Sequence, residues 1–576
     1  MKIGQQHPTT NKIYFTFFRF FTAMKSIYLF IMCLYFQFSL GQNYHLNIKG
    51  TSEIENKTID SLQYEKKHTS VASILEEQKR FENKLTNQGF FDWQLLEQKK
   101  VNDSSFVFNY RLGNTIKNNT IYIGKLSAEE KSLLQLEKDT LSITTNEVEN
   151  FMKSKIALLE KKGYSLANLQ LVNQRRIGNS LISDLQVKLN IKRNITDLVI
   201  IGYDKFPAGI KKAITKKAKK ATFNQDNLKQ INDTFDKLQF VNQIKYPEIL
   251  FTTDSTKIFV YVEKSKPNKF DGFIGFSNDD KSKLTFNGYL DLQLQNILNS
   301  GEKFNLYWKN DGNRQTSFNI GTELPYIFKT PIGIKANLRI FKQDSTFQNT
   351  VTDLNLGYYF AYNTKAFVGY QKTTSVDIQN TNSFSLNDFT NTFLTSSFEH
   401  LELNPDSFIF PEKAKVFVKF GTGNRTITSQ KTSQFFTQLD VNYSFNLNQK
   451  NSIFVRNQTF YLQSDDYVIN ELFRFGGINS IRGFNENSLQ ANAFSGIIAE
   501  YRYLLASNLY LHSITDFGYF QDKTSNTEDR LLGLGFGFGL FTKNGLFNLV
   551  YANGSTSEQA IKLSNSIVHI SFKTNF

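Results

Sequence analysis

Two different patterns of hydrophobic and polar positions divide this chain near Pro267. Before that point, from about residue 44 to 265, apolar residues recur at helical spacing in segments that alternate with short strand-like runs. After it, apolar and polar residues alternate one by one, which is the period of a β-strand with two different faces. The pattern therefore predicts an α+β first half and an all-β second half.

The strand-like segments of the second half are about ten residues long, as expected for strands that cross a membrane in a barrel. Their alternating apolar positions include Leu284, Phe286, Leu290, Leu292 and Leu294, then Ile334, Ala336, Leu338 and Ile340, then Val416, Val418 and Phe420, and finally Val568, Ile570, Phe572 and Phe576. A soluble β-sandwich also alternates, but it rarely repeats so many long strands. We predict a transmembrane β-barrel over 267–576, with about 16 antiparallel strands, because closure leaves no unpaired edge in lipid.

The first half repeats a unit of about 75 residues that contains a leading strand, a helical middle and a closing hairpin. The predicted helices lie at 71–85, 148–161 and 227–238, and the leading strands at 44–48, 120–123 and 198–201. This order resembles the POTRA domain, a small βααββ module that occurs in tandem in the periplasm. We predict three such repeats, at 42–117, 118–194 and 195–266, and other small α+β repeats remain an alternative.

The N-terminus has the features of an export signal. Lys25 precedes an apolar core at 27–36, and small and polar residues follow at 39–42. We predict a signal peptide over 1–41, with Met24 as the true start, and an uncleaved membrane anchor is the alternative. Because the flanks of Cys33 do not suit lipidation and no other cysteine exists, the mature chain has no thiol, which fits an oxidising compartment.

Composition changes this picture in two ways. Aromatic residues reach 15% and there are only 8 prolines, which suits many strands and aromatic girdles at membrane interfaces. The net charge is +15, and the densest basic run is Lys211–Lys220, where lysines occupy one face of a predicted helix. That face is either simply solvated or contacts anionic lipid headgroups or an acidic partner. No stacking or zinc-finger pattern accompanies it, so nucleic acid is not expected as a partner.

The segment Arg474–Phe484 holds the strongest candidate for a functional site. It places Gly476, Gly477, Ser480, Arg482, Gly483 and Phe484 between two strand-like runs. Glycine permits turns and close backbone approaches, and an enclosed arginine needs a carboxylate partner. The alternative is that Arg482 is only an exposed loop residue.

Within this segment, Ile481-Arg-Gly-Phe484 resembles the motif of the sixth extracellular loop in the BamA and TamA family, the outer-membrane barrel assembly and translocation proteins also called the bacterial surface antigen family. The resemblance implies that the loop folds into the lumen and that Arg482 meets acidic residues on barrel strands. Glu500 and Asp516 occupy the matching places. Phe572 and the terminal Phe576 resemble the C-terminal signal of outer-membrane barrels.

Four alternating glycines, Gly533, Gly535, Gly537 and Gly539, leave one face of a strand as bare backbone. This face either receives the inserted loop or belongs to a merely curved strand.

The sequence has no phosphate-binding loop, nucleophile elbow or cluster with metal-ligand spacing, so no catalytic residue, metal or cofactor is predicted and the chain is not expected to be an enzyme. The resemblance implies an outer-membrane assembly, insertion or translocation factor that needs no nucleotide, with its repeats in the periplasm. The expected partners are unfolded outer-membrane or secreted clients, outer-membrane lipids, and a periplasmic or inner-membrane-anchored protein. A dedicated secretion channel for one partner protein and a surface antigen without assembly activity are the alternatives.

Overall fold

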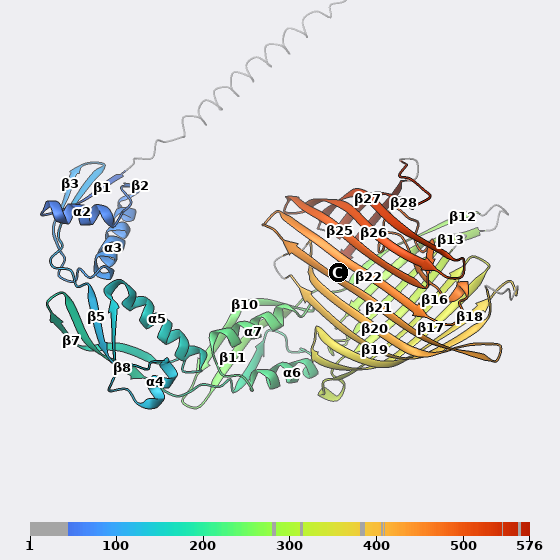
Figure 1. Cartoon of the computed structure of the whole chain (residues 1–576), viewed down its shortest axis with the longest axis horizontal. Helices are drawn as coiled ribbons and strands as arrows, with labels where there is room; N and C mark the ends of the chain where they lie inside the picture. Colours follow the sequence, from blue (N-terminus) through green and yellow to red (C-terminus); the bar gives the residue numbers. More distant parts are fainter. Residues whose placement is uncertain are drawn as a thin grey trace, which may run out of the picture. The chain divides into compact units, whose positions relative to one another are not determined.

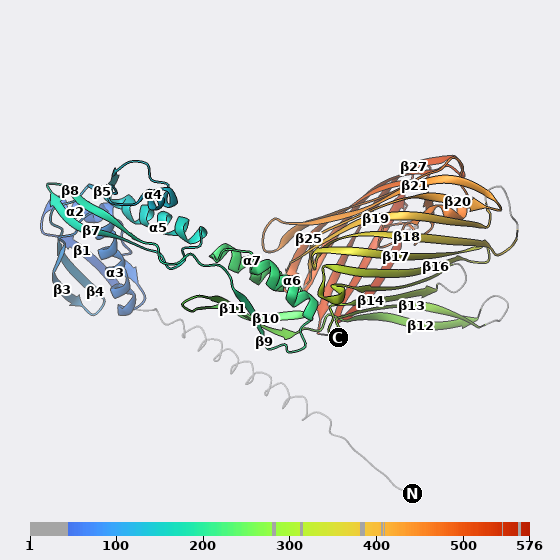
Figure 2. The same ribbon diagram turned by 90° about the horizontal axis from the view of Figure 1, so that it is seen from below.

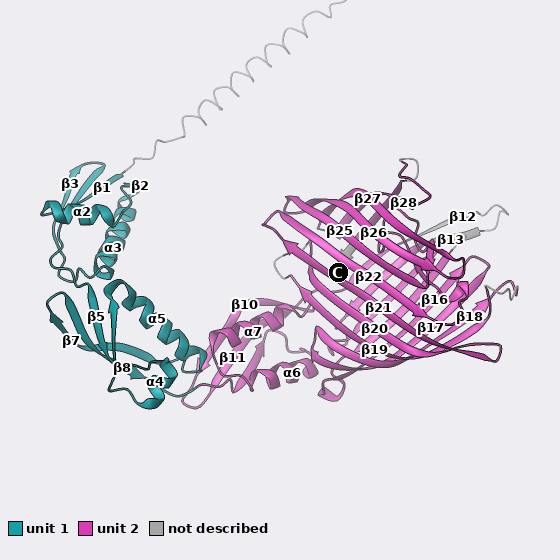
Figure 3. Ribbon diagram, viewed as in Figure 1, with its two compact units in different colours: residues 1–192 teal, residues 193–576 magenta. Residues whose placement is uncertain are grey.

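The structure is a computed structural model of the whole chain, shown in Figure 1 and turned by 90° in Figure 2. It describes residues 44–278, 284–310, 315–380, 386–404, 407, 409–543, 545–562 and 566–575. The predicted export signal at 1–41, with its start at Met24, and the terminal Phe576 therefore lie outside the described residues. The chain forms two compact units, Met1–Lys192 and Arg193–Phe576, which are coloured separately in Figure 3.

The first unit begins with a four-stranded sheet, ordered β2-β1-β4-β3, and two helices. Helix α3 begins after Ser70, whose hydroxyl accepts a hydrogen bond from the backbone N–H of Ser73 in a capping box. Its apolar residues Ile74, Phe81 and Leu85 share one face and are fully buried in the core of this layer. The elements are β1 (Tyr44–Gly50), α2 (Glu53–Ser61), β2 (Lys67–His68), α3 (Val71–Asn87), β3 (Gln94–Asn102) and β4 (Ser105–Arg111).

The same unit continues with a second sheet, ordered β6-β5-β8-β7. Its helices pack Leu134 and Leu159 on Ile121 and Leu185 of the two central strands. The elements are β5 (Asn118–Tyr122), α4 (Ala128–Leu134), β6 (Thr140–Thr144), α5 (Thr145–Lys161), β7 (Asn168–Ile177) and β8 (Ser180–Lys188).

A third sheet, ordered β10-β11-β9, opens the second unit. Its elements are β9 (Asp197–Ile201), α6 (Ala208–Ala218), α7 (Gln225–Asp236), β10 (Val241–Phe251) and β11 (Thr256–Lys264). In all three sheets the leading strand pairs in parallel with the second strand of the closing hairpin, as β1 with β4, β5 with β8, and β9 with β11. The shared topology is that of POTRA-like units, and the exact limits predicted for the three domains stay a prediction.

The sequence patterns did not predict two of the helices in the α/β domains. α2 and α4 contain 9 and 7 residues, so each spans too few turns for an apolar face to repeat clearly. Ser127 caps α4 through the backbone N–H of Glu130, and this local signal could have revealed it. Within the described part of the chain, no helix is both long and apolar enough to span a membrane.

The rest of the second unit is a closed antiparallel barrel, which confirms the predicted barrel of about sixteen strands. Its strands are β12 (Lys269–Asn278), β13 (Leu284–Gln295), β14 (Lys303–Asn310), β15 (Gln315–Leu324), β16 (Ile332–Gln343), β17 (Phe347–Ala361), β18 (Thr364–Asp377), β19 (Phe389–Leu403), β20 (Glu412–Ile427), β21 (Gln430–Asn446), β22 (Asn451–Gln463), β25 (Ala493–Ala506), β26 (Leu509–Asp522), β27 (Thr527–Thr542), β28 (Gly545–Ser555) and β29 (Ile567–Asn575). Backbone hydrogen bonds join every neighbouring pair of these strands, including the last with the first, so the ring is closed.

The two faces of the wall differ in chemistry, as strand β17 illustrates. Leu354, Leu356 and Phe360 point outward and are largely exposed, whereas Asp353 and Tyr359, at alternate positions, are buried on the lumen side. An apolar outer face and a polar inner face are what a lipid surround and an aqueous lumen require.

The third α/β domain shares a hydrophobic core with one rim of the barrel. Phe240 packs on Tyr362 with ring centroids 5.6 Å apart, and Tyr326 and Tyr359 belong to the same buried cluster. The hydroxyl of Tyr203 also donates to Asn299 in the β13–β14 turn at 2.9 Å. Because this core is continuous, the third domain and the barrel form one packed body.

The barrel closes between its first and last strands, β12 and β29. Among the described residues these strands pair at two positions, Lys269 with Asn575 and Phe270 with Thr574, whereas β28 and β29 pair at seven positions from Leu546 to Ala552. The alternating run 284–294 forms β13, the second strand of the barrel. The closure is therefore the shortest strand pairing in the wall.

A charge placed on the outer face of β17 tests this orientation. Leu354→Lys, at the middle of the strand, should lower the free energy of unfolding by about 2–4 kcal/mol, because a lysine there must enter the hydrocarbon core. Val351→Lys, on the lumen face of the same strand, is the matched control and should change it by less than about 1 kcal/mol. Urea titration of both variants in liposomes measures the difference, and equal losses would contradict the assignment of the faces.

Candidate functional site

The candidate site is the long connection between β22 and β25, residues 464–492, which folds into the barrel. It contains a short 3-10 turn, η2 (Ile469–Glu471), and a small hairpin, β23 (Phe473–Phe475) with β24 (Leu489–Ala491). Phe475 stacks on Phe494 of β25 with ring centroids 4.0 Å apart, and Ile481 is completely buried in the same cluster. This apolar core holds the segment 474–484 against the inner wall.

Arg482 is the centre of the site and is only 3% exposed. Its backbone N–H and its Nε donate to one oxygen of Asp516 at 2.9 and 2.8 Å, and its Nη2 donates to the other oxygen at 2.6 Å. Its Nη1 donates to Glu500. Glu500 lies on β25 and Asp516 on β26, so the guanidinium joins the loop to two adjacent strands. A bidentate pair of this kind combines strength with a fixed geometry.

A second arginine, which the sequence analysis did not single out, completes the charge balance. Arg502 Nε donates to the free side of Glu500 at 2.7 Å, and its guanidinium lies over the rings of Phe410 and Phe454. Two arginines thus face two carboxylates, and no net charge is left buried. Arg502 follows Glu500 by two positions in β25, so the period of the strand could have shown that both share the lumen face.

The glycines of the motif adopt backbone conformations that are unfavourable for other residues. Gly476, Gly477 and Gly483 have φ angles of +102°, +93° and +88°. A side chain at Gly483 would also strike the backbone of Asn553 and Gly554 on β28. Glycine is therefore required here both by the turn and by the close approach of the loop to the wall.

The alternating glycines of β27 meet different neighbours. A Cβ at Gly533 would collide with the backbone carbonyl of Arg482, so this position receives the loop. At Gly537 and Gly539 a Cβ would instead meet the side chains of His512 and Tyr510 on β26. One glycine of the four therefore admits the motif, and two others make room for side chains of the adjacent strand.

The remaining motif residues secure the tip of the loop. Ser480 donates from its hydroxyl to Gln458 on β22 at 2.9 Å. Phe484 packs on the cluster around Ile481, and its ring lies beside Gly554. Phe572, from the predicted C-terminal signal, lies on β29 and is exposed, while its companion Phe576 falls outside the described residues.

Two further groups of contacts hold the start of the loop, and the sequence analysis missed both. Arg425 on β20, which is 1% exposed, donates to Glu471 and Asp466 at 2.5 Å each. On β18, two strands away from β20, the hydroxyl of Ser375 accepts a hydrogen bond from Asn470 at 2.7 Å. No sequence signal pairs these residues, because 41 to 95 positions separate the partners.

The loop reaches two other parts of the wall. The guanidinium of Arg474 lies 5.4 Å from the ring centroid of Phe347 on β17, a cation–π contact. Glu486 forms an ion pair with Lys309 on β14. The connection therefore contacts strands on several sides of the lumen and occupies its interior.

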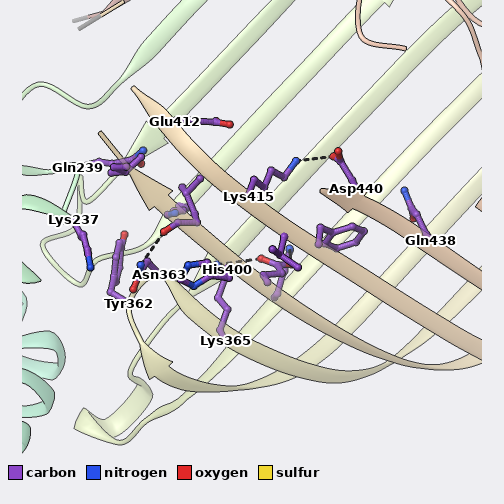
Figure 4. A pocket seen from close by; sticks show the side chains of 17 residues that line it. Lys237, Gln239, Tyr362, Asn363, Lys365, His400, Glu412, Lys415, Gln438 and Asp440 are labelled. Atoms are coloured by element: carbon purple, nitrogen blue, oxygen red, sulfur yellow. Dashed lines mark hydrogen bonds and ion pairs between the residues drawn. The ribbon is translucent and has the colours of Figure 1, made fainter. Parts of the chain in front are cut away.

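A polar cavity of about 400 Å³ lies at the barrel end that carries the third domain, and Figure 4 shows it from close by. Lys237 and Gln239 of the third domain line it together with barrel residues that include Lys365. Inside it, Lys415 pairs with Asp440 at 2.8 Å. Paired charges at this entrance fit a hydrated lumen. Among the residues that the structure describes, no group of three or more His, Cys, Asp or Glu is placed to hold a metal.

Removing the central guanidinium tests its role in the site. Arg482→Ala should lower the free energy of unfolding of the barrel by about 3–5 kcal/mol, because Asp516 would stay buried without its partner. Arg530→Ala, an exposed position on β27, is the control and should stay within about 0.5 kcal/mol of the parent. Urea titration in liposomes gives both values, and a loss at Arg482 as small as at Arg530 would contradict a structural role.

The sequence matches no protein-family profile and no curated protein. Among solved structures, CdiB from Escherichia coli is similar with a TM-score of 0.50 and 12% identity, over 90% of this chain and 98% of that chain. CdiB from Acinetobacter baumannii has a TM-score of 0.49 and 14% identity, over 88% and 97% of the two chains. BamA from Haemophilus ducreyi lacking POTRA domains 1-3 has a TM-score of 0.43 and 14% identity, over 79% and 98%.

At 12% identity the similarity to CdiB from Escherichia coli is one of fold alone. The resemblance predicted from the sequence is therefore confirmed as a shared fold. This chain has the fold of CdiB from Escherichia coli, with α/β domains followed by a sixteen-stranded antiparallel barrel.

Proposed function

We propose that this chain is an outer-membrane protein that inserts or translocates unfolded client proteins, with its three α/β domains in the periplasm. The observation that carries the proposal is the short closure of the barrel, where β12 and β29 pair at two positions among the described residues. A seam held by so few backbone hydrogen bonds can open at a smaller free-energy cost than any other strand pair of the wall. A client strand could then pair with the exposed edges.

The periplasmic domains offer the first contact for a client. The strands β3, β7 and β10 lie at the edges of their sheets, so their outer backbone groups can add an extended segment by β-augmentation. Ile244 and Tyr246 on β10 are exposed apolar residues beside such an edge. Unfolded outer-membrane or secreted proteins present matching strand-forming segments, and a periplasmic or inner-membrane-anchored partner could bind the same edges.

In the proposed mechanism, the ion pairs of Arg482 keep part of the barrel wall fixed. Arg482, with Glu500 and Asp516, holds the loop in the lumen and sets the shape of the wall at β25 and β26. The proposed mechanism uses only strand pairing and needs neither nucleotide nor catalytic residue. Arg482→Ala should therefore weaken client insertion through the shape of the barrel.

A covalent lock across the seam tests the proposed opening. Phe270→Cys with Thr574→Cys places two thiols at paired positions of β12 and β29 in a mature chain without other cysteines. Oxidation should abolish insertion of a client barrel into reconstituted liposomes, and a reductant should restore it. Phe270→Cys with Leu292→Cys links β12 to β13 instead and should leave insertion unchanged. Normal insertion by the oxidised seam variant would refute the opening.

A second candidate is a dedicated secretion channel for one partner protein, and the observation that favours it is the fold shared with CdiB. The short pairing of β12 with β29, through which a client strand could enter the wall, favours the assembly role instead. Depletion of this protein, followed by quantification of outer-membrane proteins, separates the two functions. An assembly factor should lower many barrels together, a secretion channel should lower one exported protein, and a surface antigen without assembly activity should lower none.

A further inference from the structure

A second cavity lies outside the lumen, where the third α/β domain meets the outer rim of the barrel. It has a volume of about 330 Å³, within the range of small-ligand sites. Helices α6 and α7 form two of its sides, and the β17–β18 turn forms another. Figures 1 and 2 both place these helices at this end of the barrel.

The lining of this cavity has two chemical parts. Ile214, Ile231 and Phe360 contribute an apolar surface, and the basic residues of the lining are Lys217, Lys220 and Lys237. Lys237 lies between the two cavities and lines both of them. The described lining residues include no carboxylate, and no ion pair engages any of these three lysines within the described part of the chain. Three positive charges beside an apolar surface are suited to an amphipathic anion.

The position of Phe360 identifies the kind of anion. This residue is 61% exposed and belongs to the outward face of β17, the face that carries Leu354 and Leu356. The apolar part of the cavity is therefore continuous with the lipid-facing wall of the barrel. A ligand that enters from the lipid can place its acyl chain along Phe360 and its headgroup near the lysines.

Close contacts hold helix α6, which lines the cavity, in place on the barrel. Tyr326 lines it and is buried between α6 and the barrel, where a side chain at Gly209 of α6 would strike it. Ile210 of the same helix lies against Gly301 in the β13–β14 turn. These contacts fix α6 on the barrel rim, so the cavity is part of the packed body that the third domain and the barrel form.

We propose that this cavity is a binding site for an anionic phospholipid. Lys217, Lys220 and Lys237 bind the headgroup phosphate, and the apolar residues receive the first part of an acyl chain. A bound lipid would tie the third domain to the membrane surface next to the lumen entrance. The basic face of α6, for which the sequence left solvation, lipid and an acidic partner open, would then have a lipid partner through part of its length.

The test measures lipid binding by the full mature chain in detergent, using native mass spectrometry with added phosphatidylglycerol. Replacing Lys217, Lys220 and Lys237 by Gln should weaken binding about 100-fold, because each lysine near an anionic headgroup contributes roughly fivefold. The matched control replaces Lys211, Lys212 and Lys216 of α6 by Gln; these residues lie outside the cavity, so the variant should retain the parental affinity. Gln230→Trp, which fills the cavity and keeps all lysines, should also lose binding. The mobility shift of the folded barrel in SDS verifies that every variant folds.

Three further additions distinguish the ligand. Phosphatidylcholine should bind at least tenfold more weakly than phosphatidylglycerol, and neither inorganic phosphate nor an oligoglutamate peptide should compete at equal concentration. Equal losses in the two lysine variants would indicate diffuse attraction and overturn the site. Competition by phosphate alone would assign a free anion, and competition by oligoglutamate an acidic polypeptide; either result would overturn the lipid assignment.

Discussion

The ion pairs of Arg482 with Asp516 and Glu500 are the interaction on which the interior of the barrel depends. A buried guanidinium is tolerated only when carboxylates surround it, and a buried carboxylate needs its arginine equally. Because the arginine lies on the loop and the acids lie on β25 and β26, the loop and the wall stabilise each other. Glycines at positions 483 and 533 make this geometry accessible, since any side chain there would keep the backbones apart.

The same loop connects the two sides of the short closure from inside. Gly483 lies against β28, one strand before the last, and Glu486 pairs with Lys309 on β14, two strands after the first. The seam itself has two paired positions among the described residues, so much of the restraint across it comes from the loop. A change in the loop would therefore alter the seam, although the two share no strand. Such coupling provides a physical route from the position of the loop to the proposed opening of the seam.

The outer face of the barrel wall is apolar and the inner face is polar, and this difference made the barrel predictable from the sequence. Lipid and water impose a period of 2 along every strand, so the barrel and its approximate strand number were accessible from local patterns. The sequence pattern did not predict the short helices α2 and α4, because they contain too few residues to show a clear helical period. The ion pairs of Arg425 were not predicted for another reason: its partners Asp466 and Glu471 lie 41 and 46 positions away in the sequence. A charged residue alone does not reveal which distant carboxylate will approach it.

The sequence by itself determined the alternation of faces, the repeated α/β units and the positions where the backbone must be glycine, because these properties depend on residues close together along the chain. Only the tertiary structure decided that Asp516 takes three hydrogen bonds from Arg482, that Arg502 balances Glu500, and that one glycine of four on β27 meets the motif. It also decided where α6 and α7 rest on the rim of the barrel. These outcomes depend on which surfaces come within a few ångströms after the barrel closes, and closure joins segments that are far apart in the chain.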